Sequence, residues 1–243
     1  MSIREKTLFA TGASLLLMLS VLFYVTNELI IRNFASLEQR RVVEDVGRMK
    51  SALDNALGGM NEKISDWAVW DDSYRFVVDH DQHFIKSNIS EETFKDLRLN
   101  VMAFFDPSGE IVYAGFYDKN AGKIESAPPD VLRAISSKRI VYHAKIRSSI
   151  KGLIMLPSGP MMVVSQPIVT SNRTGPIHGT IVAGRYLDDD EMRRLSKITH
   201  YRISYSSFHA SQSKNGFSEA KTKLLNGYNG VYVKTVSDNV ITG

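Results

Sequence analysis

The chain has 243 residues, with 30 Lys and Arg against 26 Asp and Glu, and it contains no cysteine. Hydrophobic residues make up 43% and charged residues 23%, a balance that allows a packed core and excludes a globally disordered chain. The lack of cysteine excludes disulfide scaffolds, thiolate zinc sites and cysteine nucleophiles. The net charge of +4 is small and scattered, so no nucleic-acid partner is expected.

Residues 7–27 carry no charged side chain. At about 1.5 Å per residue, such a helix covers about 30 Å, the thickness of the hydrocarbon core of a bilayer. Basic residues precede the segment, whereas Glu28 follows it, so the positive-inside bias predicts a cytoplasmic N-terminus and an extracytoplasmic remainder. A cleaved signal peptide needs a shorter apolar region and a small-residue site, which residues 24–27 lack. We therefore expect an uncleaved single-pass anchor in the cell membrane, with the lipid bilayer as a partner.

Apolar residues then recur at three- and four-residue steps, at Val46, Met49, Leu53, Leu57, Met60, Ile64 and Trp67. This spacing predicts one long helix with a single apolar stripe. The stripe has two equal interpretations: the helix lies on its own sheet, or it pairs with a second copy as the parallel stalk of a homodimer. Gly58 and Gly59 weaken a free-standing stalk, which favours pairing near the membrane and packing on the domain farther along.

The rest of the chain predicts an α+β fold with antiparallel hairpins and short helices. The first hairpin joins strands 99–105 and 110–116 through an Asp-Pro-Ser-Gly turn. The uncharged run 152–172 contains three prolines, which a membrane helix tolerates poorly, so we interpret it as a second hairpin. Its strands are 153–156 and 161–166. Other expected elements are a helix after residues 127–130, a loop at 171–176, a strand at 179–187, a helix capped by residues 188–190 with Met192, Leu195 and Ile198 on one side, strands at 201–208 and 231–235, and a polar loop at 210–220.

Residues 66–77 read Asp-Trp-Ala-Val-Trp-Asp-Asp-Ser-Tyr-Arg-Phe-Val. This segment resembles the signature of the CHASE family of extracellular sensor domains, fourth type (cyclase/histidine-kinase-associated sensory extracellular). The resemblance spans about residues 62 to 190. It continues through Phe84-Ile85, Asn88, Thr93-Phe94, Leu97, Asn100, residues 111–113, Gly152-Leu153, Gly159-Pro160, residues 167–169, Ser171, Gly175-Pro176 and residues 184–187.

The resemblance implies a Cache-like or PAS-like sheet behind a long N-terminal helix. It also implies an extracytoplasmic sensor between two membrane helices that detects a small-molecule ligand and feeds a cytoplasmic output. That output is typically a diguanylate cyclase or phosphodiesterase of cyclic di-GMP signalling, or the histidine kinase of a two-component system. The chain shows neither a second membrane helix nor an output module, so we expect it to stop within the last strands of the sensor. The expected domains are a cytoplasmic start (1–6), a membrane helix (7–27), a stalk (28–62) and an incomplete sensor (63–243).

The candidate ligand residues begin with Trp67 and Trp70, which share a face if both lie on one helix. They serve either as anchors of that helix on the sheet or as the aromatic wall of a pocket. Asp71 and Asp72 point about 100° apart on a helix, which excludes an acid/base pair unless the helix breaks there. Asp71 is expected to pair with Arg75 and Asp72 to hydrogen-bond nearby backbone, with contact to a ligand or cation as the alternative.

Tyr74 belongs to the same signature. Arg185 stands in an otherwise apolar strand, so it must be paired or face a cavity; binding an anionic group and pairing with Asp71 or Asp72 are equal alternatives. Asn88 and Asn100 are turn or cap residues, or hydrogen-bond a ligand. His80 and His83 lack further clustered ligands, so no metal is expected.

No nucleotide-binding, zinc-protease or hydrolase motif is present, so we expect no cofactor and no catalytic residue in this chain. Enzymatic activity is expected only in a missing C-terminal module. Two other functions remain open: a membrane-tethered periplasmic binding or assembly protein with no signalling output, which predicts an exposed apolar patch, and a periplasmic enzyme, which predicts titratable groups converging in a cleft.

Overall fold

The structure of the protein is a computed structural model that describes residues 3–201, 234–237 and 240–242. Side chains are described for residues 3–27, 41 and 43–201. The chain divides into two units, Met49–Ser204 and a second unit made of Met1–Arg48 and Tyr205–Gly243. The predicted polar loop at 210–220 and nearly all of the predicted strand at 201–208 lie outside the described residues.

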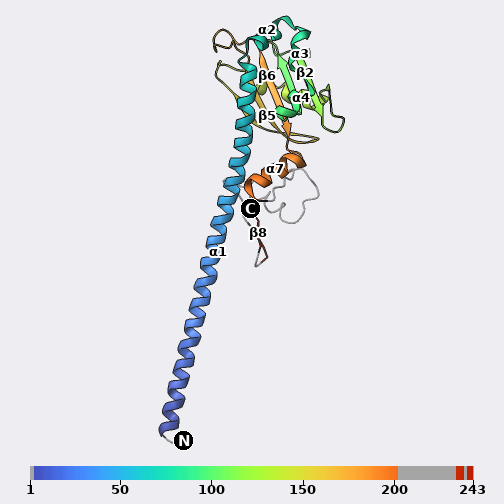
Figure 1. Ribbon diagram of the computed structural model, residues 1–243. Coiled ribbons are helices and arrows are strands. Elements are labelled where there is room, and N and C mark those ends of the chain that lie inside the picture. The colour runs from blue at the N-terminus through green and yellow to red at the C-terminus, as the bar shows by residue number, and fades with distance from the viewer. Residues whose placement is uncertain (1–2, 202–233, 238–239, 243) are drawn as a thin grey trace. The chain divides into compact units, whose positions relative to one another are not determined.

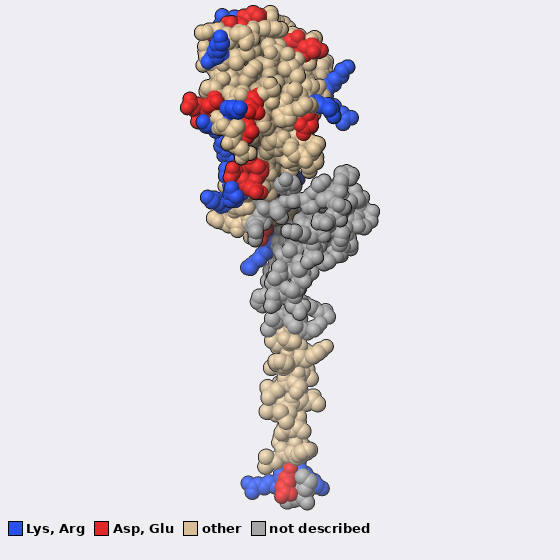
Figure 2. All heavy atoms as spheres, turned by 90° about the vertical axis from the view of Figure 1, so that its right-hand side faces the viewer, with Lys and Arg blue, Asp and Glu red and all other residues tan. Residues whose placement is uncertain are grey.

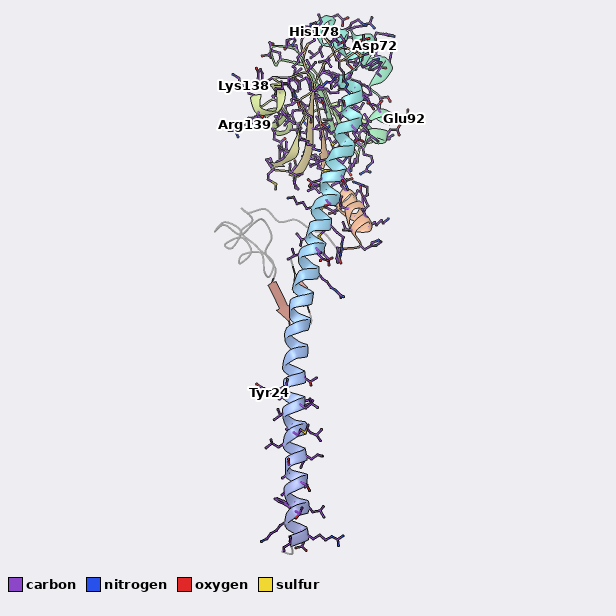
Figure 3. All side chains as sticks on the ribbon, turned by 90° about the vertical axis from the view of Figure 1, so that its left-hand side faces the viewer. Tyr24, Asp72, Glu92, Lys138, Arg139 and His178 are labelled. Atoms are coloured by element: carbon purple, nitrogen blue, oxygen red, sulfur yellow. The ribbon has the colours of Figure 1, made fainter. Side chains whose placement is uncertain are left out.

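The second unit contains the first part of helix α1 (Ile3–Ala68) and a short hairpin of β7 (Lys234–Ser237) and β8 (Val240–Thr242). The segment Ile3–Asn27 has a mean hydropathy of 2.1 and is not buried, so it is long and apolar enough to cross a membrane. Figure 2 shows it as a stretch of uncharged atoms that begins at a small group of charged residues. Tyr24 points outward near its end (Figure 3).

The sheet of the other unit has six antiparallel strands in the order β3-β2-β1-β6-β5-β4 (Figure 1). The strands are β1 (Val101–Phe105), β2 (Ile111–Asp118), β3 (Lys123–Ser126), β4 (Ile150–Leu156), β5 (Gly159–Pro167) and β6 (Thr180–Tyr186). The helices are the end of α1, α2 (Asp71–Asp79), α3 (Gln82–Asn88), α4 (Glu91–Leu97), α5 (Pro129–Ile135), α6 (Lys138–Val141) and α7 (Asp189–Thr199).

Both faces of this sheet are covered, because side chains alternate between two cores along each central strand. Met102 and Phe104 face α1, α2, α3, α4 and α7, and we call this side the α1 face. Val101 and Phe105 face α5 and α6, and we call this side the α5 face. Glu92 of α4 and Lys138 and Arg139 of α6 point away from the domain on opposite sides (Figure 3). Burial on both faces explains why β1, β5 and β6 are mostly apolar and do not alternate between apolar and polar residues.

The predicted α+β class, with a long helix and a Cache-like or PAS-like antiparallel sheet, is confirmed. Both predicted hairpins form, and the second excludes a membrane helix at residues 152–172. The predicted stripe packs on the α1 face through Leu57, Met60 and Ile64, so the far half of the helix lies on its own sheet.

Several elements differ from the prediction. Ile198 is 56% exposed, and the buried side of α7 is instead Glu191, Met192, Leu195 and Thr199. A helix turns by about 100° per residue, so position 198 lies at the edge of the face that positions 191, 192, 195 and 199 form, rather than at its centre. The short elements β3, α3, α4 and α6 carry too few residues to give a periodic signal.

Candidate functional site

The two tryptophans lie at a joint between helices. Helix α1 ends at Ala68, and Trp70 is an extended residue (φ −137°) that precedes α2. Val69 forms a parallel bridge with Val169, whose N–H donates to the Ala68 carbonyl at 3.0 Å. Their three-residue spacing would place both tryptophans on one face of a single helix, but Trp67 lies on α1 and Trp70 lies between α1 and α2. Their rings nevertheless meet edge to face, with centroids 5.9 Å apart.

Aromatic rings fill the space beneath this joint. The ring centroids of Trp70 and Phe84 are 5.6 Å apart, and Phe84 stacks on Phe76 with centroids 4.5 Å apart. Phe76 and Phe84 both meet Phe104 of β1 edge-on. These contacts are those of anchors that hold the joint on the sheet. A role of Trp67 and Trp70 in ligand binding stays a prediction.

The two aspartates of the signature have exchanged their expected partners. The Asp71 carboxylate accepts a hydrogen bond from the Ser171 N–H at 2.9 Å, and the Asp71 N–H donates to Ser171 Oγ at 3.2 Å. Arg75 pairs with Asp72, so the predicted Asp71–Arg75 pair is wrong. The reason is that α2 begins at Asp71, which turns this side chain toward the neighbouring loop. Both carboxylates also lie in the first turn of α2, where the helix dipole favours negative charge.

Tyr74 and Asn88 lie in the same region. The Tyr74 ring stacks on His178, with centroids 3.9 Å apart and an interplanar angle of 12°. Figure 3 shows His178 and Asp72 at one end of the domain. Asn88 Nδ2 donates to the Phe84 carbonyl at 2.9 Å at the end of α3, which is the cap role expected for it.

Asn100 and Arg185 belong to a different part of the domain. Asn100 is buried, and its Oδ1 accepts a hydrogen bond from the Tyr186 N–H at 2.9 Å, which ties the start of β1 to the end of β6. Arg185 is 6% exposed. Its Nε donates to the Arg98 carbonyl at 2.6 Å and its Nη2 to the Leu97 carbonyl at 2.9 Å. It does not pair with Asp71 or Asp72, because β6 delivers it to the last turn of α4.

The ionic partner of Arg185 is Glu191 on α7, with Nη1 and Oε1 3.5 Å apart. Arg194 donates from Nε to the same oxygen at 3.1 Å, and Arg98 pairs with Oε2. Burial works to raise the pKa of Glu191, but the hydrogen bond from Arg194 and the positive charges of Arg185, Arg194 and Arg98 outweigh it. The pKa of Glu191 therefore lies below its ordinary value of 4.5, and the carboxylate stays charged.

A hollow of about 440 Å³ lies beside these residues, between α4, β2 and α7. Its lining includes Lys95, Arg98, Arg185 and Arg194, with Phe94 and Tyr117 as apolar walls. Sequence reasoning found Arg185 but missed Glu191, Arg98 and Arg194. The one signal was the helical spacing of Glu191 with Leu195 and Thr199, which marks a carboxylate on a buried stripe.

The α5 face carries a different buried ionisable group. His143 Nε2 lies 2.9 Å from Ser165 Oγ, and Nδ1 lies 2.8 Å from Ser148 Oγ. Burial lowers the pKa of His143 from 6.5 to about 4, so the imidazole is neutral at pH 7. A larger hollow of about 740 Å³ opens between α6 and the β1–β2 turn, with His143 in its lining.

Among residues 3–201, 234–237 and 240–242, no three His, Asp or Glu side chains gather as metal ligands. His80 ends α2 in the left-handed conformation, and His83 lies 3.3 Å from Ser87 Oγ.

The chain is similar in sequence to a histidine kinase and in fold to solved sensor domains. It is 24% identical over 241 residues to the methanogenesis regulatory histidine kinase FilI of Methanothrix harundinacea (strain 6Ac). The match covers 99% of this chain and 26% of the kinase, so the chain spans about a quarter of that protein.

Two solved structures are also similar. The periplasmic domain of Vibrio cholerae LuxQ is 12% identical, with 71% of this chain and 82% of that one covered and a TM-score of 0.45. A domain of a putative sensory box/GGDEF family protein from Vibrio parahaemolyticus is 14% identical, with 65% and 64% covered and a TM-score of 0.42. The family model described as the CHASE4 domain matches residues 52–206, more than half of the chain, and the protein therefore belongs to the CHASE4 family of sensor domains.

Proposed function

We propose that this chain is the extracytoplasmic sensory input of a membrane-bound signalling protein. It detects a small ligand and relays the event to a cytoplasmic output, a histidine kinase or a diguanylate cyclase or phosphodiesterase, outside these residues. One observation carries the proposal: the helix that contains the apolar segment Ile3–Asn27 also supplies the stripe that packs on the sheet of the CHASE4 domain. Because α1 is one continuous helix, a change in the packing of that stripe can move the apolar segment at its other end.

The proposal includes the topology and the partners. Residues 1–6 are cytoplasmic, residues 7–27 cross the membrane, residues 28–62 form a stalk, and the domain from residue 63 onward is extracytoplasmic. Two copies associate through the membrane-near part of the stripe. The ligand-contact candidates remain Trp67, Trp70, Asp71, Asp72, Tyr74, Asn88, Asn100 and Arg185, and of these Asn100 and Arg185 line hollows.

The relay is tested by placing residues 1–243 in the membrane histidine kinase FilI in place of the matching segment, and by measuring autophosphorylation in membrane vesicles across a panel of small metabolites. We expect at least one metabolite to change the phosphorylation level several-fold. Protease treatment of spheroplasts should cleave the domain from outside and leave the N-terminus protected. A chimera that is folded and inserted but silent toward every metabolite that binds the chain would overturn the relay.

The dimer has its own test, because the chain contains no native cysteine. Val46→Cys lies on the stripe, and Glu44→Cys lies about 160° away on the same helix. We expect oxidation of membranes to cross-link the first variant and leave the second monomeric on a non-reducing gel. Equal cross-linking of both variants would count against a stalk that pairs through the stripe.

A second candidate is a membrane-tethered binding protein with no output. One observation favours it: the edge strand β4 exposes Leu153 (48%) and Met155 (59%), which a partner strand or surface could cover. Leu153→Lys together with Met155→Lys should abolish capture of that partner while leaving the kinase response of the chimera unchanged. Loss of the kinase response in this variant would instead assign the edge strand to signalling.

A further inference from the structure

We propose that the hollow between α4, β2 and α7 is a binding site for a small multivalent oxyanion, one that carries two or three carboxylate or phosphate charges. Binding itself is a property of this domain alone. Its use as the signal rests on the proposed sensory function.

The first argument is the balance of charge. Three guanidinium groups, from Arg98, Arg185 and Arg194, share the single carboxylate of Glu191. Lys95 adds a fourth positive charge to the lining, with its Nζ 5.8 Å above the ring of Tyr117.

The other charges in the lining are already paired. Lys119 forms an ion pair with Asp188, and Asp190 forms one with Arg193. The hollow therefore holds an excess of positive charge beside apolar walls, where the field of each charge is screened less than in bulk water.

The second argument is the geometry of the donors. Arg185 is fixed, because its Nε and Nη2 are used by the carbonyls at the end of α4 and its Nη1 faces Glu191. Arg98 and Arg194 are different: their side chains are 42% and 32% exposed.

Among the described residues, Arg98 contacts Glu191 only through Nη2, and Arg194 uses Nε and Nη2, which leaves Nη1 of both available. Guanidinium forks with spare N–H groups match the paired oxygens of carboxylates and phosphates. Burial is the main cause of the lowered pKa of Arg185; the negative charge of Glu191 works against it, and the like charges of Arg98 and Arg194 lower it further.

The third argument is size. A volume of about 440 Å³ lies within the range of small-molecule sites, roughly 300–1,000 Å³. Phe94 and Tyr117 supply the apolar wall against which the carbon skeleton of such an anion packs. A structural cluster that only fixes α7 on α4 uses the N–H groups that contact Glu191, and it gives no role to the Nη1 groups of Arg98 and Arg194.

The test uses the full chain in detergent and isothermal titration with citrate, succinate and inorganic phosphate at constant ionic strength, with sodium chloride as the blank. We expect saturable binding of at least one of these anions. Arg98→Gln and Arg194→Gln should each weaken it about tenfold, the equivalent of ~1.4 kcal/mol for one charge-assisted contact. Arg98→Lys, which keeps the charge but loses the fork, should fall between the wild type and Arg98→Gln.

Lys197→Gln is the matched control, because it removes a positive charge from the exposed side of α7 outside the hollow. It should bind as the wild type does. The two tryptophans, both beside the sheet, report in the same samples that each variant is folded.

The inference is overturned if no anion gives saturable binding beyond chloride, or if the folded Arg98→Gln, Arg194→Gln double variant binds like the wild type. Selective response to phosphate assigns phosphate chemistry to the site, and selective response to citrate or succinate assigns carboxylate chemistry. Binding that follows these rules without changing the output of the kinase chimera leaves the site standing and overturns its role as the signal.

Discussion

The two faces of the sheet bury ionisable groups in opposite ways. On the α1 face, Glu191 stays charged because three arginines surround it. On the α5 face, His143 meets two serine hydroxyls and, among the residues that the structure describes, no opposite charge, and it stays neutral. The comparison shows two solutions to one problem: a buried charge must be paired, and an unpaired group gives up its charge. The cluster around Glu191 has more positive than negative charges, and this excess is available to a ligand.

The largest effect should come from the neutral part of the α1 face. Phe76 is 1% exposed and contacts both Phe84 and Phe104. Phe76→Ala leaves a cavity and should lower the free energy of unfolding by about 4 kcal/mol. Val78→Ala, at a 59% exposed position of the same helix, should change it by less than about 0.5 kcal/mol. Denaturant unfolding followed by tryptophan fluorescence measures both, and similar values would show that α2 is not anchored through Phe76.

The charged part of the α1 face comes next. Glu191→Gln keeps the shape but leaves the buried Arg185 without an ionic partner, which should lower the free energy of unfolding by about 3 kcal/mol. Arg98 and Arg194 contribute less to this figure because both are partly exposed. The control Glu92→Gln removes an exposed carboxylate of α4 and should be neutral within about 0.5 kcal/mol. An equally small effect at Glu191 would mean that water, rather than the arginines, solvates its carboxylate.

The α5 face is probed by pH. The pKa of His143 is about 4 in the folded chain, and its ordinary value is 6.5. Between pH 4 and pH 6.5, the unfolded chain therefore binds a proton at this residue that the folded chain does not bind. Stability is therefore highest above pH 6.5 and falls as the pH drops toward 4, by up to about 3 kcal/mol from this group. His143→Gln should remove this part of the pH dependence. Identical pH profiles for variant and wild type would show that His143 titrates normally.

Glu191 should respond in a lower pH range. Its folded pKa is depressed, so its contribution is present above pH 4.5 and is lost as the pH falls below that value toward the folded pKa. Subtracting the profile of Glu191→Gln from that of the wild type isolates this loss, which separates the paired group from the neutral one. A difference confined to pH 5–7 would contradict the assignment.

The smallest effects should separate the neighbouring aspartates of the signature. Asp71→Ala removes the hydrogen bond that the carboxylate accepts from the Ser171 N–H and should lower the free energy of unfolding by about 1 kcal/mol. Asp72→Ala removes only an exposed ion pair with Arg75 and should change it by about 0.3 kcal/mol. The reverse order would mean that Asp72 makes a stronger contact than its surface pair.

The sequence by itself determined whatever repeats or caps over short distances. The uncharged segment, the stripe from Leu53 to Ile64, the two hairpins and the Asp188 cap follow from periodicity and turn chemistry, because each depends on residues within a few positions of one another.

Only the tertiary structure decided the partners of the site residues. Asp71 meets Ser171, Val69 meets Val169, and Arg185 meets the carbonyls of residues 97 and 98, all across separations of 87 to 100 residues. Such pairs arise when strands and helices from distant parts of the chain are brought together, and spacing along the chain carries no record of them. The segment 66–77 therefore forms a structural joint, whereas the basic hollow is built from residues that come from separate parts of the chain.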